Sequence, residues 1–126
     1  MKKIINTTNA PGAIGPYSQA TVHNGVLYVS GQLPIDPATG ELLSSDIGSE
    51  TRLVMQNMKA IVQEAGSSMD KILKTTILLT DLGDFVKVNE AYAEFFDGNY
   101  PARICYQVVA LPKGARVEID AVCAVE

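Results

Sequence analysis

The 126-residue sequence contains no apolar run that approaches the roughly 20 residues needed to span a bilayer. Its first apolar pair, Ile4 and Ile5, is followed at once by the polar residues Asn6-Thr7-Thr8-Asn9, so no secretory hydrophobic region is visible. The sequence also lacks blocks of like charge and low-complexity tracts. We therefore expect one domain that covers residues 1–126, folds throughout and resides in the cytoplasm.

Cysteine and histidine are scarce. Cys105 and Cys123 lie inside apolar, strand-like runs without a CxxC or Cys/His grouping, which argues against a disulfide framework and against a zinc site, and favours buried free thiols. His23 is the only histidine and Ser30 has no evident base beside it, so a serine triad has no support. Motifs of nucleotide-binding loops and of HExxH zinc enzymes are absent too, which removes those enzyme classes.

An excess of basic residues is also missing. The formal net charge is −4, the isoelectric point is about 4.9, and the ten lysines and arginines are spread along the chain. A nucleic-acid backbone attracts a positively charged surface, so this composition disfavours nucleic-acid binding. We expect a small-molecule partner instead.

Hydrophobic periodicity predicts elements in the order β-β-β-α-β-α-β-β. The turn Asn24-Gly25 suits a type I′ hairpin, Gly66 suits the end of a first helix, and Asp84 can cap a second helix. Because helices and strands do not alternate strictly, we expect an α+β fold, a mixed sheet with two helices packed on one face. The predicted strands span residues 2–6, 20–23, 26–30, 72–79, 104–109 and 117–125; the helices begin near 46–49 and after 84, the second with Phe85, Val88, Tyr92, Phe95 and Phe96 on one side.

Both faces of the late strands carry apolar residues. In the last strand, Val122 and Ala124 lie opposite the apolar face that includes Ile119; in the strand at 72–79, Leu73, Ile77 and Leu79 are expected opposite Ile72 and Leu78. Two helices cover only one face, so we expect another copy of the chain to cover the second. The composition does not distinguish a dimer from a trimer, and a modestly apolar exposed face is the alternative.

Arg103 is the first candidate for chemistry. It follows Tyr100-Pro101-Ala102, where the proline stiffens the entry to a predicted strand. A guanidinium aimed by a fixed backbone can hold a carboxylate through two parallel hydrogen bonds. Alternation places Arg103, Cys105 and Gln107 on one side of this strand. A surface salt-bridge arginine is the alternative, and these residues taken alone favour it.

Glu118 is the second candidate, because it lies between Val117 and Ile119 in an apolar strand. A carboxylate in such a place is usually paired or functional. Burial would raise its pKa and let it activate a water as a general base or donate a proton. A structural ion pair with Arg116 or Arg103 explains the position about equally well.

Loop residues could border a ligand. Tyr17 lies on the proline-stiffened loop Gly15-Pro16-Tyr17-Ser18 and offers a phenol, although most tyrosines on such loops only pack. Gly31, which follows Ser30, would let a ligand approach the backbone closely. Cys105 lacks a neighbouring histidine and is better explained as an inert core thiol than as a nucleophile.

Motifs in a fixed order resemble the RidA (YjgF-type) family. They cover nearly the whole chain and comprise Ala13-Ile14-Gly15-Pro16-Tyr17-Ser18-Gln19, Ser30-Gly31-Gln32, Asn57-Met58-Lys59-Ala60-Ile61, Lys74-Thr75-Thr76, Asp81-Leu82, Asn89, Pro101-Ala102-Arg103, Leu111-Pro112-Lys113-Gly114 and Val117-Glu118-Ile119. The resemblance implies a homotrimer with a chorismate-mutase-like α+β fold and ligand clefts between subunits.

The resemblance also implies an activity, the hydrolysis of 2-iminobutanoate, 2-iminopropanoate and related imino or enamine acids to 2-oxo acids and ammonia. By position, Arg103 would bind the substrate carboxylate and Glu118 would orient the attacking water. The pocket would be shaped by Tyr17, Ser30, Gly31, Asn89 and Cys105. No cofactor is required, because an iminium carbon is already electrophilic.

Other functions would use part of the same site. A non-catalytic module that senses 2-oxo acids would need Arg103 but would require Glu118 only for packing. A ribonuclease or translation inhibitor, also described in this family, is disfavoured by the acidic balance of the chain. A purely structural interaction protein fits the site positions least well.

Overall fold

The computed structural model describes residues 1–126 and contains six strands and two α-helices. Their order is the predicted β-β-β-α-β-α-β-β. The elements are β1 (Lys3–Ile5), β2 (Ala20–His23), β3 (Val26–Gln32), α1 (Ile47–Glu64), β4 (Ile72–Leu79), α2 (Phe85–Ala93), β5 (Ala102–Gln107) and β6 (Val117–Ala124), with short 3₁₀ turns at Met69–Lys71, Leu82–Asp84 and Pro112–Gly114.

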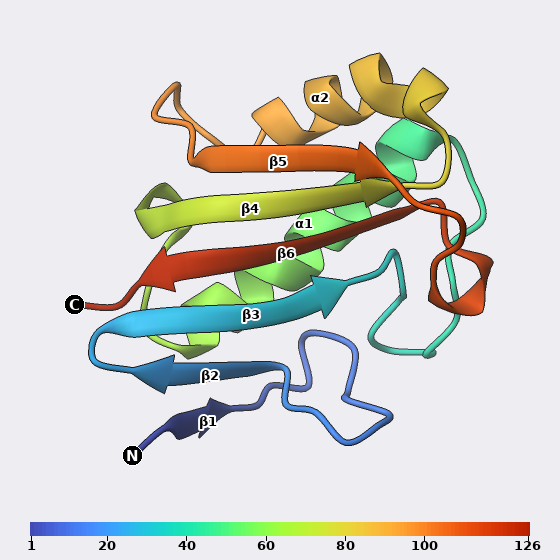
Figure 1. Cartoon of the computed structure of the whole chain (residues 1–126). Coiled ribbons are helices and arrows are strands. Elements are labelled where there is room, and N and C mark those ends of the chain that lie inside the picture. Colours follow the sequence, from blue (N-terminus) through green and yellow to red (C-terminus); the bar gives the residue numbers. More distant parts are fainter.

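The strands form one sheet in the order β1-β2-β3-β6-β4-β5. All neighbours are antiparallel except β4 and β5, which are parallel because α2 connects them by a crossover. Both helices lie on the same side of the sheet, and the face toward the viewer carries no helix (Figure 1). The predicted α+β architecture, a mixed sheet with two helices on one face, is confirmed.

Local sequence signals set several element ends. Asn24 and Gly25 have φ angles of 50° and 75°, as a type I′ turn requires, so the predicted hairpin between β2 and β3 is confirmed. The Asp46 carboxylate accepts a hydrogen bond from the Ser49 N–H and caps α1. A hydrogen bond from the Ser49 hydroxyl, together with this N–H contact, lowers the pKa of Asp46 to about 2. Gly66, with φ 81°, follows the last turn of α1 as expected.

The core lies between the sheet and the helices. One face of β6, formed by Val117, Ile119, Ala121 and Cys123, is buried against it, as the alternation of the sequence indicates. Helix α1 adds Val54, Met55, Met58, Ile61 and Val62, and all of these belong to a single cluster of 20 buried residues.

Four predictions about local structure were wrong. Asp84 makes no capping hydrogen bond, because it belongs to a 3₁₀ turn that Asp81 caps. Helix α2 ends at Ala93, so Phe95 and Phe96 lie beyond it, and β5 ends at Gln107, so residues 108 and 109 are outside the strand. Leu73 does not share a face with Ile77, because a register shift between Ile72 and Lys74 leaves Leu73 52% exposed.

The helix-free face is partly apolar, as expected. Tyr28, Leu73, Ile104 and Tyr106 are exposed large side chains on three of its strands. No helix of the chain has both the length and the apolar character needed to cross a membrane.

Candidate active site

Arg103 lies on β5, the edge strand of the sheet, with its side chain toward α2. Its Nη1 donates a 2.7 Å hydrogen bond to Asn89 Oδ1. The guanidinium carbon also lies 5.5 Å from the centre of the Phe85 ring and 5.3 Å from the centre of the Tyr92 ring, within cation–π range. An open cavity of about 450 Å³ adjoins this cluster and is lined by Arg103, Asn89, Tyr92, Ala93, Tyr100 and Pro101.

Arg103 has no acidic partner. The chain contains three arginines and two ion pairs, Arg52 with Glu94 and Arg116 with Glu50. The surface salt bridge that the local sequence favoured for Arg103 is therefore not formed. Apart from the contact to Asn89, its N–H groups make no hydrogen bond within the chain, and the exposed residue lines the cavity, so these donors can bind an anion.

Tyr92 supports this cluster from within the core. Its hydroxyl lies 2.6 Å from Thr75 Oγ1, and both residues are buried. Burial raises the pKa of Tyr92, while the Thr75 hydrogen bond and the Arg103 charge act in the opposite direction. Sequence reasoning placed Tyr92 only in the helix packing. The signal it missed is the spacing of Phe85, Asn89 and Tyr92, which puts two rings and an amide on one helix face.

Cys105 and Gln107 face the same side as Arg103, as strand alternation predicts. Gln107 Oε1 accepts a hydrogen bond from the Leu82 N–H, and Cys105 packs against the core. Burial raises the pKa of the Cys105 thiol, although the nearby Arg103 charge opposes the shift. Both cysteines are free thiols; Cys123 is fully buried and Cys105 only partly.

Glu118 lies on the opposite, helix-free face. It borders a groove of about 600 Å³ together with Tyr17, Ser30 and Gly31, so the structure brings these four predicted site residues together. Burial raises the pKa of Glu118, and the Asp120 carboxylate adds to this shift. No side chain or backbone N–H of the chain donates to its carboxylate. The ion pair considered with Arg116 or Arg103 is therefore not formed.

Gly31 leaves room for the Glu118 carboxylate. A methyl group at residue 31 would overlap the Glu118 carboxylate and approach its carboxyl carbon to 2.8 Å. The sequence predicts close approach of a ligand to the Gly31 backbone. In the structure, the Glu118 side chain of the same chain lies against it. Ser30 braces the groove, because its Oγ donates a 2.6 Å hydrogen bond to the Ser18 carbonyl.

Buried amides hold the loops that border this groove. Gln19, only 2% exposed, accepts a hydrogen bond from the Thr7 N–H at 2.7 Å and donates one to the Pro11 carbonyl at 2.8 Å. Asn57, on α1, donates to the Leu33 and Ile35 carbonyls. Gln19 ends the motif that begins at Ala13, and Asn57 begins the motif that ends at Ile61. Their role is to fix the irregular backbone of these loops.

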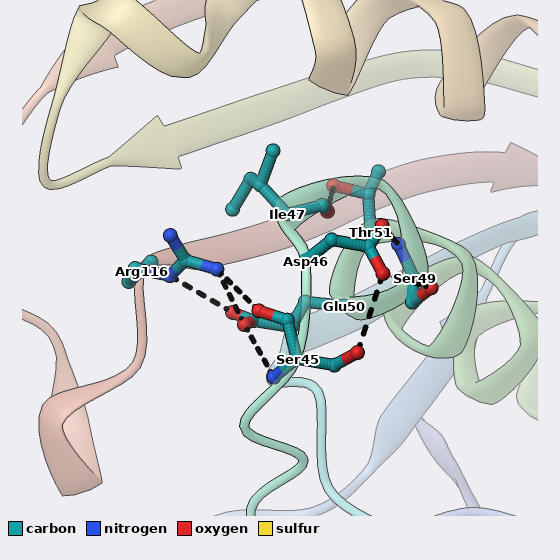
Figure 2. A network of polar contacts seen from close by, with 7 residues as sticks. All are labelled: Ser45, Asp46, Ile47, Ser49, Glu50, Thr51 and Arg116. Atoms are coloured by element: carbon teal, nitrogen blue, oxygen red, sulfur yellow. Dashed lines mark hydrogen bonds and ion pairs between the residues drawn. The ribbon is translucent and has the colours of Figure 1, made fainter.

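Arg116 makes a structural ion pair at the start of β6. It donates to the buried Glu50 carboxylate at 2.6 Å and to the Ser45 carbonyl at 2.7 Å (Figure 2). The same carboxylate accepts the Ser45 N–H at 3.1 Å. This network joins the entry of β6 to the first turn of α1.

The two candidate catalytic residues are separated within one chain. Arg103 belongs to β5 and Glu118 to β6, with β4 between them, and their side chains lie on opposite faces of the sheet. Asn89 and Cys105 accompany Arg103; Tyr17, Ser30 and Gly31 accompany Glu118. A small ligand cannot contact both halves of the site in one copy of the chain. No group of three or more His, Cys, Asp or Glu side chains is placed to hold a metal ion.

The chain is similar to proteins of one family. The family model described as Endoribonuclease L-PSP matches residues 7–125. A RutC family protein of Sinorhizobium fredii is 56% identical over 94% of each chain, and a human 2-iminobutanoate/2-iminopropanoate deaminase is 48% identical over 97% of this chain and 89% of that protein.

Solved structures give the same result. A Rid family protein of Yersinia pestis superposes with a TM-score of 0.97 at 51% identity, covering 99% of this chain and all of the other. The E. coli protein TdcF, solved with bound serine, superposes with a TM-score of 0.93 at 46% identity, covering 98% and 99% of the two chains. The chain therefore belongs to the Endoribonuclease L-PSP family, the YjgF/RidA family that its motifs resemble.

Proposed function

We propose that this protein hydrolyses reactive 2-imino and enamine acids, such as 2-iminobutanoate and 2-iminopropanoate, to 2-oxo acids and ammonia, and so protects pyridoxal-phosphate enzymes. The observation that carries the proposal is Arg103, an arginine without an acidic partner that Asn89 and two rings hold beside a cavity. Human and mouse relatives with the name of this activity, at 48% and 46% identity, support it. So does the serine in TdcF, which carries the same carboxylate group as the imino acids.

Arg103 supplies the binding step. Two of its N–H groups donate to the two carboxylate oxygens of the substrate, which orients the neighbouring C=N carbon. Water then adds to this carbon, the C–N bond breaks, and ammonia leaves with the 2-oxo acid. The imine carbon is electrophilic without help, so positioning contributes more than acid–base strength, and no cofactor enters the scheme.

Glu118 binds and activates the attacking water. Its carboxylate has no partner in the chain, so it is free to accept a hydrogen bond from a water and to take a proton as the C–O bond forms. The raised pKa of Glu118 makes it a better base than an exposed glutamate. The same proton can then be returned to the departing nitrogen. Tyr17 and Gly31 shape the groove around this water.

A homotrimer unites the two halves of the site. Arg103 of one protomer would meet Glu118 of its neighbour, because the halves lie on opposite faces of one sheet. The exposed apolar residues of the helix-free face, among them Tyr28, Ile104 and Tyr106, would be buried between protomers. A monomer at micromolar concentration in light scattering would contradict this assembly.

A coupled assay tests the activity. A threonine dehydratase generates the imine, and the lifetime of the intermediate and the release of ammonia are followed with and without this protein. We expect faster ammonia release with the wild type and none above background with Arg103→Ala. Arg52→Ala is the matched control, because Arg52 is an exposed arginine paired with Glu94. Wild-type activity in Arg103→Ala would refute the carboxylate clamp.

Subunit mixing tests the shared site. Arg103→Ala alone is expected to be inactive, and Glu118→Gln alone is expected to keep about 1% of the wild-type turnover. If each site combines Arg103 and Glu118 from different protomers, random co-assembly of equal amounts restores about a quarter of the sites. Complete lack of recovery in co-expressed mixed oligomers would place both residues of a working site on one chain.

The alternative without turnover makes a different prediction. A 2-oxo acid sensor would bind 2-oxobutanoate tightly but release no ammonia from the imine.

The family description names an endoribonuclease, but the net charge of −4 disfavours a polyanionic substrate. RNA binding that weakens steeply with salt would contradict this preference.

A further inference from the structure

We propose that Tyr92, fixed by Thr75, is a positioning residue that aims the Arg103 guanidinium at a ligand carboxylate. This inference deepens the proposed function, because it rests on Arg103 acting as a carboxylate clamp. Tyr92 itself touches Arg103 and does not need to touch the ligand.

Arg103 requires such a support because of where it lies. It stands on an edge strand, it is exposed, and no carboxylate holds its side chain. A long side chain in this setting samples many rotamers, and each binding event must order it. The contacts that restrict it all come from α2: the Asn89 hydrogen bond and the rings of Phe85 and Tyr92.

Thr75 fixes the ring that Arg103 lies against. Thr75 on β4 is the register partner of Arg103 on β5, so both side chains lie on the helix side of neighbouring strands. The Tyr92 hydroxyl reaches this threonine at 2.6 Å, while its ring lies 5.3 Å from the guanidinium carbon. One tyrosine therefore connects the buried strand to the exposed cation.

Aromatic packing also holds the Tyr92 ring. Phe96 lies 5.0 Å from the Tyr92 ring centre, and Tyr100 lies 6.1 Å from Phe96. The Tyr92 ring is thus constrained by a hydrogen bond at one end and by aromatic packing on its side. A phenylalanine would fill the same space but would leave the buried Thr75 hydroxyl without this partner.

The experiment measures KM and kcat for the imine, and the Kd for 2-oxobutanoate by calorimetry, in Tyr92→Leu, Tyr92→Phe and Thr75→Val. We expect Tyr92→Leu to raise KM and Kd about 5-fold, the factor expected for one lost cation–π contact of an ordered arginine. We expect kcat to stay within about 2-fold, because Arg103 and Glu118 are both retained and a bound substrate is still oriented by the same clamp.

The conservative variants test the hydrogen bond. Tyr92→Phe and Thr75→Val should each raise Kd about 2-fold, since the ring remains but is less constrained. The double variant should be no worse than either single one, because it leaves no orphaned hydroxyl. Additive losses in the double variant would contradict the coupling.

Val62→Ala is the control for stability, because Val62 is fully buried on α1 and lies outside the candidate site. It should lower the melting temperature and leave KM and Kd unchanged. Unchanged KM and Kd in Tyr92→Leu, or an equal rise in Val62→Ala, would overturn the positioning role. If the wild type released no ammonia, the deaminase proposal would fail, but the Kd values for 2-oxobutanoate would still test the positioning role of Tyr92. If the wild type also bound no 2-oxobutanoate, both the deaminase proposal and the positioning role would fail.

Discussion

Two pairs of arginine and glutamate in this molecule behave in opposite ways. Arg116 and Glu50 meet at 2.6 Å and tie the start of β6 to α1, and Glu50 is almost fully buried (Figure 2). Arg103 and Glu118 lie on opposite faces of the sheet and neither has a partner of opposite charge. Residue types alone do not distinguish these pairs.

Whether an arginine and a glutamate pair within the chain decides if their charges stabilise the fold or remain available to a ligand. A joined pair uses its charges within the fold, and its geometry is complete in one chain. A separated pair keeps its donors and acceptors for other molecules, which costs stability because Glu118 is partly buried without a compensating charge. An unpaired arginine and an unpaired, half-buried carboxylate are therefore the expected features of a binding site.

The largest effect on stability should come from breaking the joined pair of Arg116 and Glu50. Arg116→Met should lower the free energy of unfolding by about 2 kcal/mol, because it leaves the Glu50 carboxylate buried without its cation. The loss is below that of a fully buried pair, since the Arg116 side chain is 42% exposed. Arg103→Met should change it by less than about 1 kcal/mol. Urea unfolding of both variants measures the contrast, and equal losses would remove it.

The second effect concerns Glu118 and pH. Glu118→Gln should lower kcat about 100-fold, within the usual range for a general base, and change the Kd for 2-oxobutanoate far less. Because burial raises the Glu118 pKa, wild-type activity should fall as the pH drops through a value above the ordinary 4.3 or so of glutamate. This acidic limb should disappear in the variant. Equal losses in kcat and binding would make Glu118 a structural residue.

The same raised pKa has a consequence for stability. The folded state binds the Glu118 proton more tightly than the unfolded state does, so the contribution of this group to stability is greatest at low pH. That contribution is lost as the pH rises through the raised pKa. The stability of Glu118→Gln relative to the wild type should therefore increase with pH over this window. Parallel curves of unfolding free energy against pH would contradict this sign.

A smaller effect should follow from moving the carboxylate. Gly31→Ala places a methyl group where the Glu118 carboxylate lies, and the side chain must shift. We expect kcat to fall about 10-fold with little change in melting temperature, since a displacement of this kind affects positioning more than packing. Gly12→Ala is the matched control, because no atom lies within 4 Å of a methyl group there. Full activity in Gly31→Ala would show that the water is held elsewhere.

The smallest effect should come from the third pair. Arg52 and Glu94 meet at 2.9 Å between α1 and α2, but both side chains are more than two-fifths exposed. Because water screens such a pair, Arg52→Met should shift the melting temperature by no more than about 2 °C. If Arg52→Met lowered the melting temperature as much as Arg116→Met does, the presence of an ion pair, and not its burial, would set its contribution to stability.

Much of the fold could be predicted from local patterns. The hairpin at Asn24-Gly25 and the strand at 72–79 followed from turn chemistry and alternation, and α1 from apolar residues at helical spacing. The errors arose where tertiary contacts override local preference. Asp84 had a suitable side chain for a cap, but Asp81 starts the chain turning three residues earlier. The bulge that exposes Leu73 has no signal in the local sequence.

The candidate site was predicted less completely. Arg103 and Glu118 could be named from their strand context and from motif order, but their partners could not. Local sequence favoured a salt bridge for Arg103 and allowed one for Glu118, and neither forms. The partner of Arg116 is Glu50, 66 residues away, so no spacing rule identifies it.

The sequence by itself determined most of the buried faces, how the elements follow one another, and which side chains carry charge, because these depend on periodicity and residue type over short distances. Only the tertiary structure decided which charges are neutralised. Sheet order and register place Arg103 beside Thr75 and Tyr92, and put Glu118 on the other face. Electrostatic pairing acts over a few ångströms in space, and distance along the chain does not specify it.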